Sequence, residues 1–161
     1  MRLLRHLFAP SAHGMFPPEA MARITAAIDA GELRHAGEIC FAVDPALHWL
    51  DVLRGADPRT QAEDAFARLR VWDTEANTGV LIYLLLADHR IEIVADRGLR
   101  GVEPARWRAI SDDISAGLRD GVPADAIVRG IQALSDLLAE HAPLVAGRED
   151  RDELPNTPRF L

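Results

Sequence analysis

The chain has 161 residues, 48% of them hydrophobic and 27% charged, a balance that suits one globular domain and excludes disorder throughout. A formal net charge of −7, without any local run of basic residues, argues against binding to nucleic acid or to an anionic membrane surface. The single cysteine excludes an internal disulfide and a multi-cysteine zinc site. No apolar stretch has the length of a membrane-spanning helix, and the basic, interrupted start does not have the form of a signal peptide. We therefore expect a cytoplasmic protein without direct membrane insertion.

Three parts are expected along the chain. Residues 1–17 form an arm that lies on the domain, residues 18–143 form an α/β domain, and residues 144–161 form a flexible tail rich in Arg, Asp, Glu and Pro. The domain opens with a helix, because Pro18 suits a first helical turn, and this helix ends near Gly31.

Strands are expected at 37–43, at 80–87 and at 91–95. The second is an unbroken apolar run, which is typical of a strand covered on both faces. Asp88 and His89 separate the second strand from the third, and both residue types tolerate positive φ. A tight hairpin is therefore expected there.

The first two strands are joined by a helix that begins at Asp57-Pro58 or at Thr60 and runs to about Leu69, so they should be parallel and connected by a right-handed crossover. Two further helices are expected, from Pro104 to Gly121 and from Pro123 to Ala142. With helices on both faces, the fold class is α/β: a three-layer α/β/α sandwich around a small mixed β-sheet of three or four strands.

This topology brings the starts of the first two strands and the end of the third to one end of the sheet. Three oxygen-bearing side chains at that end are predicted to bind Ca²⁺ or another divalent cation, namely Asp73, Asn77 and Asp96. Five more residues are predicted to contribute to binding at the same end: Glu32, His35, Glu38, Thr74 and Arg97.

An alternative explanation of these residues stays open. Asp, Thr and Asn bond to nearby backbone N–H groups, so Asp73, Thr74 and Asn77 can simply shape a turn. Asp96 and Arg97 can likewise be an ordinary strand end. A catalytic set is not defined, since the chain has no phosphate-binding loop, no Gly-x-Gly-x-x-Gly, no Gly-x-Ser-x-Gly and no His-Glu-x-x-His.

Several segments, in order, resemble the TPM domain family, named for a thylakoid lumen protein, a photosystem II repair protein and a worm receptor modulator. The strongest are residues 66–74, 77–82, 88–93 and 96–99, within a similarity that runs from about Pro18 to Pro143. The resemblance implies an α/β/α sandwich. It also implies that some relatives are acid phosphatases, that some bind calcium in surface loops, and that many are membrane-tethered. This chain is similar to a short, soluble bacterial form, because it shows neither signal sequence nor membrane anchor.

The favoured functional hypothesis is a module that binds a divalent cation or a protein partner. The alternative is a metal-assisted acid phosphatase acting on small phosphoesters, in which a cation polarises a phosphoryl oxygen. A third hypothesis is an oligomerisation domain whose tail docks on a partner.

Overall fold

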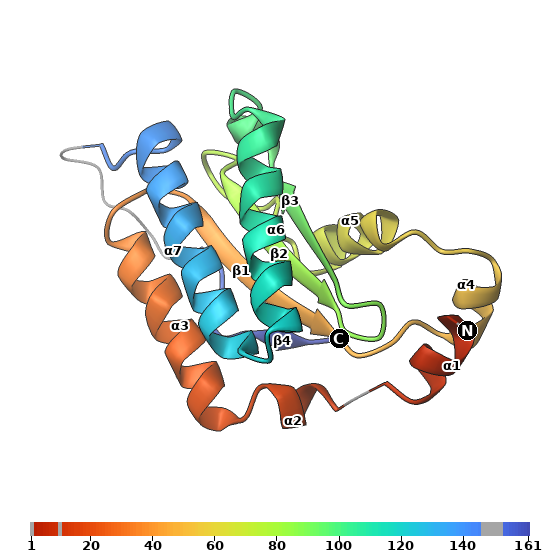
Figure 1. Cartoon of the computed structure of the whole chain (residues 1–161). Coiled ribbons are helices and arrows are strands. Elements are labelled where there is room, and N and C mark those ends of the chain that lie inside the picture. Colours follow the sequence, from red (N-terminus) through yellow and green to blue (C-terminus); the bar gives the residue numbers. More distant parts are fainter. Residues whose placement is uncertain (1, 10, 146–152) are drawn as a thin grey trace.

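A computed structural model describes residues 2–9, 11–145 and 153–161 (Figure 1). Helices and strands follow one another in the order expected of an α/β domain. They are α1 (Arg2–Leu7), α2 (Ala12–Met15), α3 (Pro18–Glu32), β1 (Glu38–Asp44), α4 (Trp49–Leu53), α5 (Pro58–Arg68), β2 (Gly79–Leu85), β3 (Arg90–Ala95), the 3₁₀ helix η1 (Arg97–Leu99), α6 (Pro104–Arg119), α7 (Pro123–His141) and β4 (Arg159–Phe160).

The strands form one mixed sheet in the order β3-β2-β1-β4. β1 and β2 are parallel over their whole length, from Glu38 opposite Gly79 to Asp44 opposite Leu85. β3 returns antiparallel to β2. The parallel first pair and the hairpin were both expected from the sequence, and both are confirmed.

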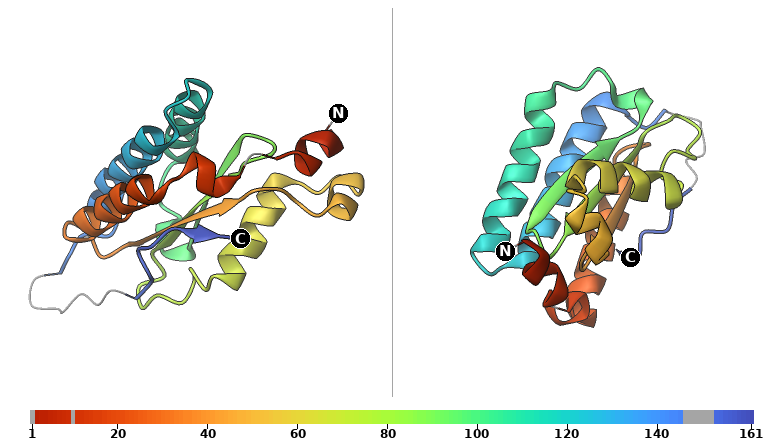
Figure 2. Two further views of the ribbon diagram at one scale, coloured as in Figure 1. Left: turned by 90° about the horizontal axis from the view of Figure 1, so that it is seen from below. Right: turned by 90° about the vertical axis from the view of Figure 1, so that its right-hand side faces the viewer.

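Helices cover both faces of this sheet. α3, α6 and α7 lie on one face, and α5 lies on the other with α4 near it (Figure 2, left). The predicted α/β/α sandwich is therefore confirmed. No helix in the described parts of the chain combines the length and apolar character needed to cross a membrane.

Alternate residues of each strand point to opposite layers. Ile39, Phe41 and Val43 of β1 pack with α3 and α7, whereas Cys40 and Ala42 pack toward α5. Every residue of β2 is buried, because this inner strand is covered on both faces. The unbroken apolar run in the sequence follows from that position.

The hairpin turn forms at the expected residues. His89 adopts a φ of 51°, and its backbone N–H donates to the carbonyl oxygen of Leu86 over 3.0 Å. A histidine adopts a positive φ more readily than a β-branched residue does, so His89 suits the backbone conformation that the hairpin turn requires.

The C-terminal segment requires a correction to the expected flexible tail. Arg159 and Phe160 form β4, paired in parallel with Ala42 and Val43 of β1, and Leu154 is buried in the core. Residues 153–161 therefore belong to the folded domain, because they cover the outer edge of β1. Residues 146–152 of the expected tail lie outside the described residues.

Candidate functional site

The end of β3 is closed by a compact turn. The Oδ1 atom of Asp96 accepts from the backbone N–H of Arg97 over 2.7 Å, and so caps the short helix η1. The backbone N–H of Asp96 donates to the carbonyl oxygen of Gly79 over 2.9 Å. The start of β2 and the end of β3 are thus fixed to each other at this end of the sheet.

The same turn contacts the loop that precedes β2. The Nε atom of Arg97 donates to Oδ1 of Asn77 over 2.9 Å, and the N–H of Gly98 donates to the carbonyl oxygen of Asn77 over 2.9 Å. Asn77 has a φ of 55°, which an asparagine tolerates. Three of the predicted site residues, Asn77, Asp96 and Arg97, therefore lie together.

Asp73 and Thr74 have local partners in that loop. Asp73 pairs with Arg70 over 2.5 Å, and Oγ1 of Thr74 accepts from the N–H of Thr78 over 3.0 Å. Both contacts shape the turn, as the alternative explanation of the sequence states. The carboxylate of Asp73 is directed to its own loop rather than to Asp96.

The acidic residues near β1 contact the C-terminal segment. The two carboxylate oxygens of Glu38 accept from the backbone N–H groups of Glu153 and Leu154, over 3.2 and 3.3 Å. Glu32, at the end of α3, accepts from Nδ2 of Asn156 over 2.7 Å. His35 is fully buried, and its backbone forms an isolated bridge with Pro143. These three predicted binding residues are thus engaged within the fold.

Metal-binding capacity at this end is limited in the structure. Among residues 2–9, 11–145 and 153–161, no three His, Cys, Asp or Glu side chains come together as a metal-binding group. The buried Oδ2 atom of Asp96 has no hydrogen-bond partner within that set. It is therefore the one oxygen of the predicted cation ligands that is both buried and available, so the cation site stays a prediction.

A hollow of about 690 Å³ opens beside Asp96, between β3, η1, α5 and α6. We call it the arginine groove, because four arginines line it together with one carboxylate. Its charged lining residues are Arg59, Asp96, Arg97, Arg100 and Arg108. Apolar side chains, among them Leu99, Val102 and the partly buried Trp107, form the rest of its wall.

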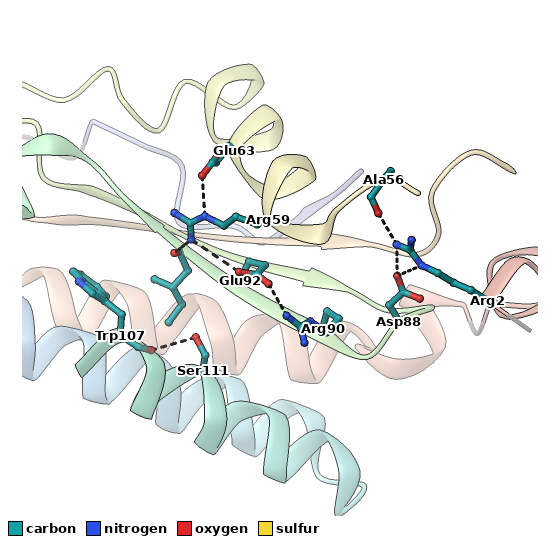
Figure 3. A network of polar contacts seen from close by, with 10 residues as sticks. Arg2, Ala56, Arg59, Glu63, Asp88, Arg90, Glu92, Trp107 and Ser111 are labelled. Atoms are coloured by element: carbon teal, nitrogen blue, oxygen red, sulfur yellow. Dashed lines mark hydrogen bonds and ion pairs between the residues drawn. The ribbon is translucent and has the colours of Figure 1, made fainter. Parts of the chain in front are cut away.

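Two arginines of the groove are held by the protein itself. Arg59 donates to Glu63 over 2.8 Å and to the carbonyl oxygen of Ile93 over 2.6 Å, as Figure 3 shows. Arg97 donates to Asn77. By contrast, no side-chain hydrogen bond or ion pair joins Arg100 or Arg108 to another residue in the described part of the chain. Their guanidinium groups are exposed and available to an anion.

Sequence reasoning missed this groove. The expectation that the chain has no basic patch is corrected here, because Arg59, Arg97, Arg100 and Arg108 come from three separate elements and form no run in the sequence. Of these four arginines, only Arg97 and Arg100 lie close together in the sequence, on one short turn. Contact with Arg59 and Arg108 depends on the packing of α5 and α6 on β3.

A second polar cluster lies at the opposite end of the sheet. The hydroxyl of Tyr83 donates to Asp44 over 2.8 Å, and burial raises the pKa of the Asp44 carboxyl although this hydrogen bond opposes the rise. Asp88 accepts two hydrogen bonds from Arg2 (Figure 3), and Nε2 of His6 lies 3.1 Å from its other oxygen. Burial alone would raise the pKa of Asp88, but the hydrogen bonds and charge of Arg2 lower it overall. This cluster fastens α1 to the hairpin.

Comparisons with known proteins agree with this architecture. A family model described as the TPM domain matches residues 11–137. The structure is similar to the NMR structure of BA42 protein from the psychrophilic bacterium Bizionia argentinensis, with a TM-score of 0.77 and 28% identity over 88% of this chain and 92% of that chain. A search of curated proteins gives no match. The arginine groove lies wholly within the matched region, whereas residues 153–161 lie beyond the family model.

Proposed function

Since the chain belongs to the TPM domain family, whose model covers residues 11–137, we propose that it is a non-catalytic binding module that takes an anionic partner in the arginine groove. The observation that carries this proposal is the pair Arg100 and Arg108. Both are exposed and line one hollow, and neither guanidinium group has a hydrogen bond or ion pair with the described residues.

Charge favours an anion at this place over others on the surface. The groove is lined by four arginines and one carboxylate, in a chain whose net charge is −7. A guanidinium presents its N–H donors as a planar fork that matches carboxylate and phosphate oxygens. Arg100 and Arg108 therefore supply donors that a ligand can use without displacing an existing partner.

The cation form of the same hypothesis depends on Asp96. Its buried Oδ2 atom and the amide oxygen of Asn77 are two oxygens, whereas Ca²⁺ takes about six to eight. Asn77 could bind a cation only after losing its hydrogen bond from Arg97. Asp73 could do so only after losing its ion pair with Arg70. Binding of a divalent cation by Asp73, Asn77 and Asp96 is thus a second proposal, with weaker support.

A metal-assisted phosphatase is the alternative use of the groove. Arg97 and Arg100 would orient a phosphoester, and a cation near Asp96 would supply Lewis-acid chemistry. These residues fit the cation only in part, so no catalytic step is derived through it. The binding module requires nothing beyond the arginines already in place.

The main test measures binding of pyrophosphate by titration calorimetry. The double substitution Arg100→Ala and Arg108→Ala should weaken binding by about two- to thirtyfold, because two exposed ion pairs contribute about 0.2–1 kcal/mol each. Arg54→Ala is the matched control, since Arg54 is an exposed arginine of the α4 end that lies outside the groove. Equal affinity in the double variant and the native protein would refute the proposal.

The cation and the phosphatase proposals are tested separately. Thermal melting with Ca²⁺, Mg²⁺ and Mn²⁺ should show stabilisation that Asp96→Asn removes, because a ligand of the folded state raises its stability. Hydrolysis of a generic phosphoester that depends on cation and on Asp96 would favour the enzyme. Unchanged melting with all three ions would reject the cation site.

A further inference from the structure

The strand β3 leaves one edge of the sheet without a neighbouring strand. In the order β3-β2-β1-β4, the opposite edge is covered at β1 by the C-terminal strand β4, but β3 has β2 alone beside it in the described residues. A free edge presents backbone N–H and C=O groups to any extended chain that can approach it.

The register shows which backbone groups point outward. Asp96 bonds to Gly79 of β2, and every second residue of β3 before it also faces β2. Ile91, Ile93 and Ala95 therefore direct their N–H and C=O groups away from β2, where Arg59 already occupies the carbonyl oxygen of Ile93 and the three N–H groups face outward. The contact of Arg59 with the carbonyl oxygen of Ile93 confirms this direction, because Arg59 approaches from outside the sheet (Figure 3).

The free edge is hollowed along its length. The arginine groove lies against Ile93 and Ala95. A second hollow of about 390 Å³ lies against Ile91 and Glu92, at the hairpin end of the same strand. Arg108 lines both, so the two hollows adjoin and follow β3 between its two ends.

The charges along this edge select an occupant. The two hollows are lined by six arginines and three carboxylates, the arginines being Arg59, Arg90, Arg97, Arg100, Arg108 and Arg119. Glu92 is already paired with Arg90 over 3.2 Å. A second copy of this chain would bring arginines against arginines if its β3 paired here, which is unfavourable. An acidic segment has the complementary charge.

We propose that the free edge of β3 receives an extended acidic segment of a partner protein as an added β-strand, with its carboxylates on Arg100 and Arg108. The N–H groups of Ile91, Ile93 and Ala95 supply the main-chain donors of such an addition. This inference rests on the proposed function and deepens it, since it names the chemical class of the partner and its mode of binding.

The test uses a short peptide of alternating glutamate and valine, and the same peptide N-methylated at alternate residues. Methylation removes backbone donors but leaves the charge, so affinity should fall by about tenfold. Amide hydrogen exchange of the protein should slow at Ile91, Ile93 and Ala95 when the unmodified peptide is added, but not when the N-methylated peptide is added. Pyrophosphate, which has no backbone, should not protect these amides.

A protein variant gives an independent measurement. Ala95→Pro removes an outward N–H that takes no part in the β2 ladder and places ring carbons where an added strand would lie. It should weaken binding of the unmodified peptide by about tenfold relative to Ala95→Ser, and it should remove the difference in affinity between the unmodified and the N-methylated peptide. Circular dichroism and melting show whether each variant is folded.

The possible outcomes separate the two proposals. Equal affinity of both peptides without amide protection would overturn the strand addition and leave the groove as a simple anion site. Failure of pyrophosphate and both peptides to bind would overturn both proposals. Self-association of the chain through β3, seen by sedimentation and abolished by Ala95→Pro, would identify a second copy as the occupant and overturn the acidic partner.

Discussion

Gly98 determines how closely the turn after β3 approaches the loop before β2. Its N–H donates to the carbonyl oxygen of Asn77, and a Cβ at this position would lie 2.5 Å from that oxygen and 2.6 Å from the carbonyl oxygen of Ala76. Backbone atoms cannot move aside as a flexible side chain can. The juxtaposition of Asp96, Arg97 and Asn77 therefore depends on a residue without a side chain.

The substitution Gly98→Ala should destabilise the protein by about 1–3 kcal/mol, because it forces the two loops apart. Urea unfolding followed by circular dichroism measures this change. Gly101→Ala is the matched control, since a Cβ at Gly101 meets nothing within 4 Å, and it should change stability by less than about 0.5 kcal/mol. Similar losses of stability in both variants would show that Gly98 is not needed for the close approach of the two loops.

Asp88 should make the stability of the protein depend on acidic pH. Arg2 lowers the pKa of its carboxyl in the folded state, so the ionised form stabilises the protein above the unfolded pKa of about 3.9, and this stabilisation is lost as pH falls through the folded pKa. Asp88→Asn should therefore lower the free energy of unfolding by about 1–3 kcal/mol at neutral pH. The difference from the native protein should narrow below about pH 4.

Urea titrations at several pH values test this dependence. Asp136→Asn is a suitable control, because Asp136 forms an exposed pair with Arg34 and its loss should cost about 0–1 kcal/mol. A difference between Asp88→Asn and native protein that stays constant from neutral to strongly acidic pH would contradict the argument.

At the scale of elements, sequence pattern predicted the interior of the sheet better than its edges. The apolar run of β2 and the turn at His89 are local signals, and the sequence pattern alone predicts both. β4 could not be predicted, because two residues in a polar, proline-rich segment have no periodicity of their own. They become a strand only because β1 offers a free edge.

At the candidate site too, the sequence predicted one part and missed another. The common position of Asp96, Arg97 and Asn77 followed from strand direction, which the sequence determined through its crossover helix and hairpin. The arginine groove did not follow, because Arg59 and Arg108 reach it from α5 and α6, two helices far apart in the sequence. Helix rotation against a sheet is determined by core packing, which periodicity predicts only approximately.

The C-terminal segment should contribute measurably to stability. Leu154 is buried between β1 and the α5 layer, so Leu154→Ala should cost about 2–4 kcal/mol through lost burial and the cavity left behind. Leu144→Ala is the control, since Leu144 is 42% exposed and should cost less than about 1 kcal/mol. Thermal and urea unfolding measure both, and equal, small losses would mean that residues 153–161 are not part of the folded core.

At the scale of the whole molecule, the net charge and the arginine groove act at different distances. The net charge of −7 repels an acidic partner at long range, whereas Arg100 and Arg108 attract it only on close approach. Salt screens interactions beyond about 10 Å at 0.1 M, so it weakens the long-range repulsion as well as the exposed ion pairs. The two rate constants of binding should therefore respond to salt differently.

We expect the association rate constant of an acidic peptide to stay constant or to rise as salt increases, because repulsion by the rest of the surface is screened. The dissociation rate constant should increase by about two- to thirtyfold, since two exposed ion pairs contribute about 0.2–1 kcal/mol each. Surface plasmon resonance at several salt concentrations separates the two constants. In the variant with Arg100→Ala and Arg108→Ala, the dissociation rate should lose its salt dependence, whereas Arg54→Ala should keep it. A steep fall of the association rate with salt would instead show that a positive field, and not local contact with the groove, captures the peptide.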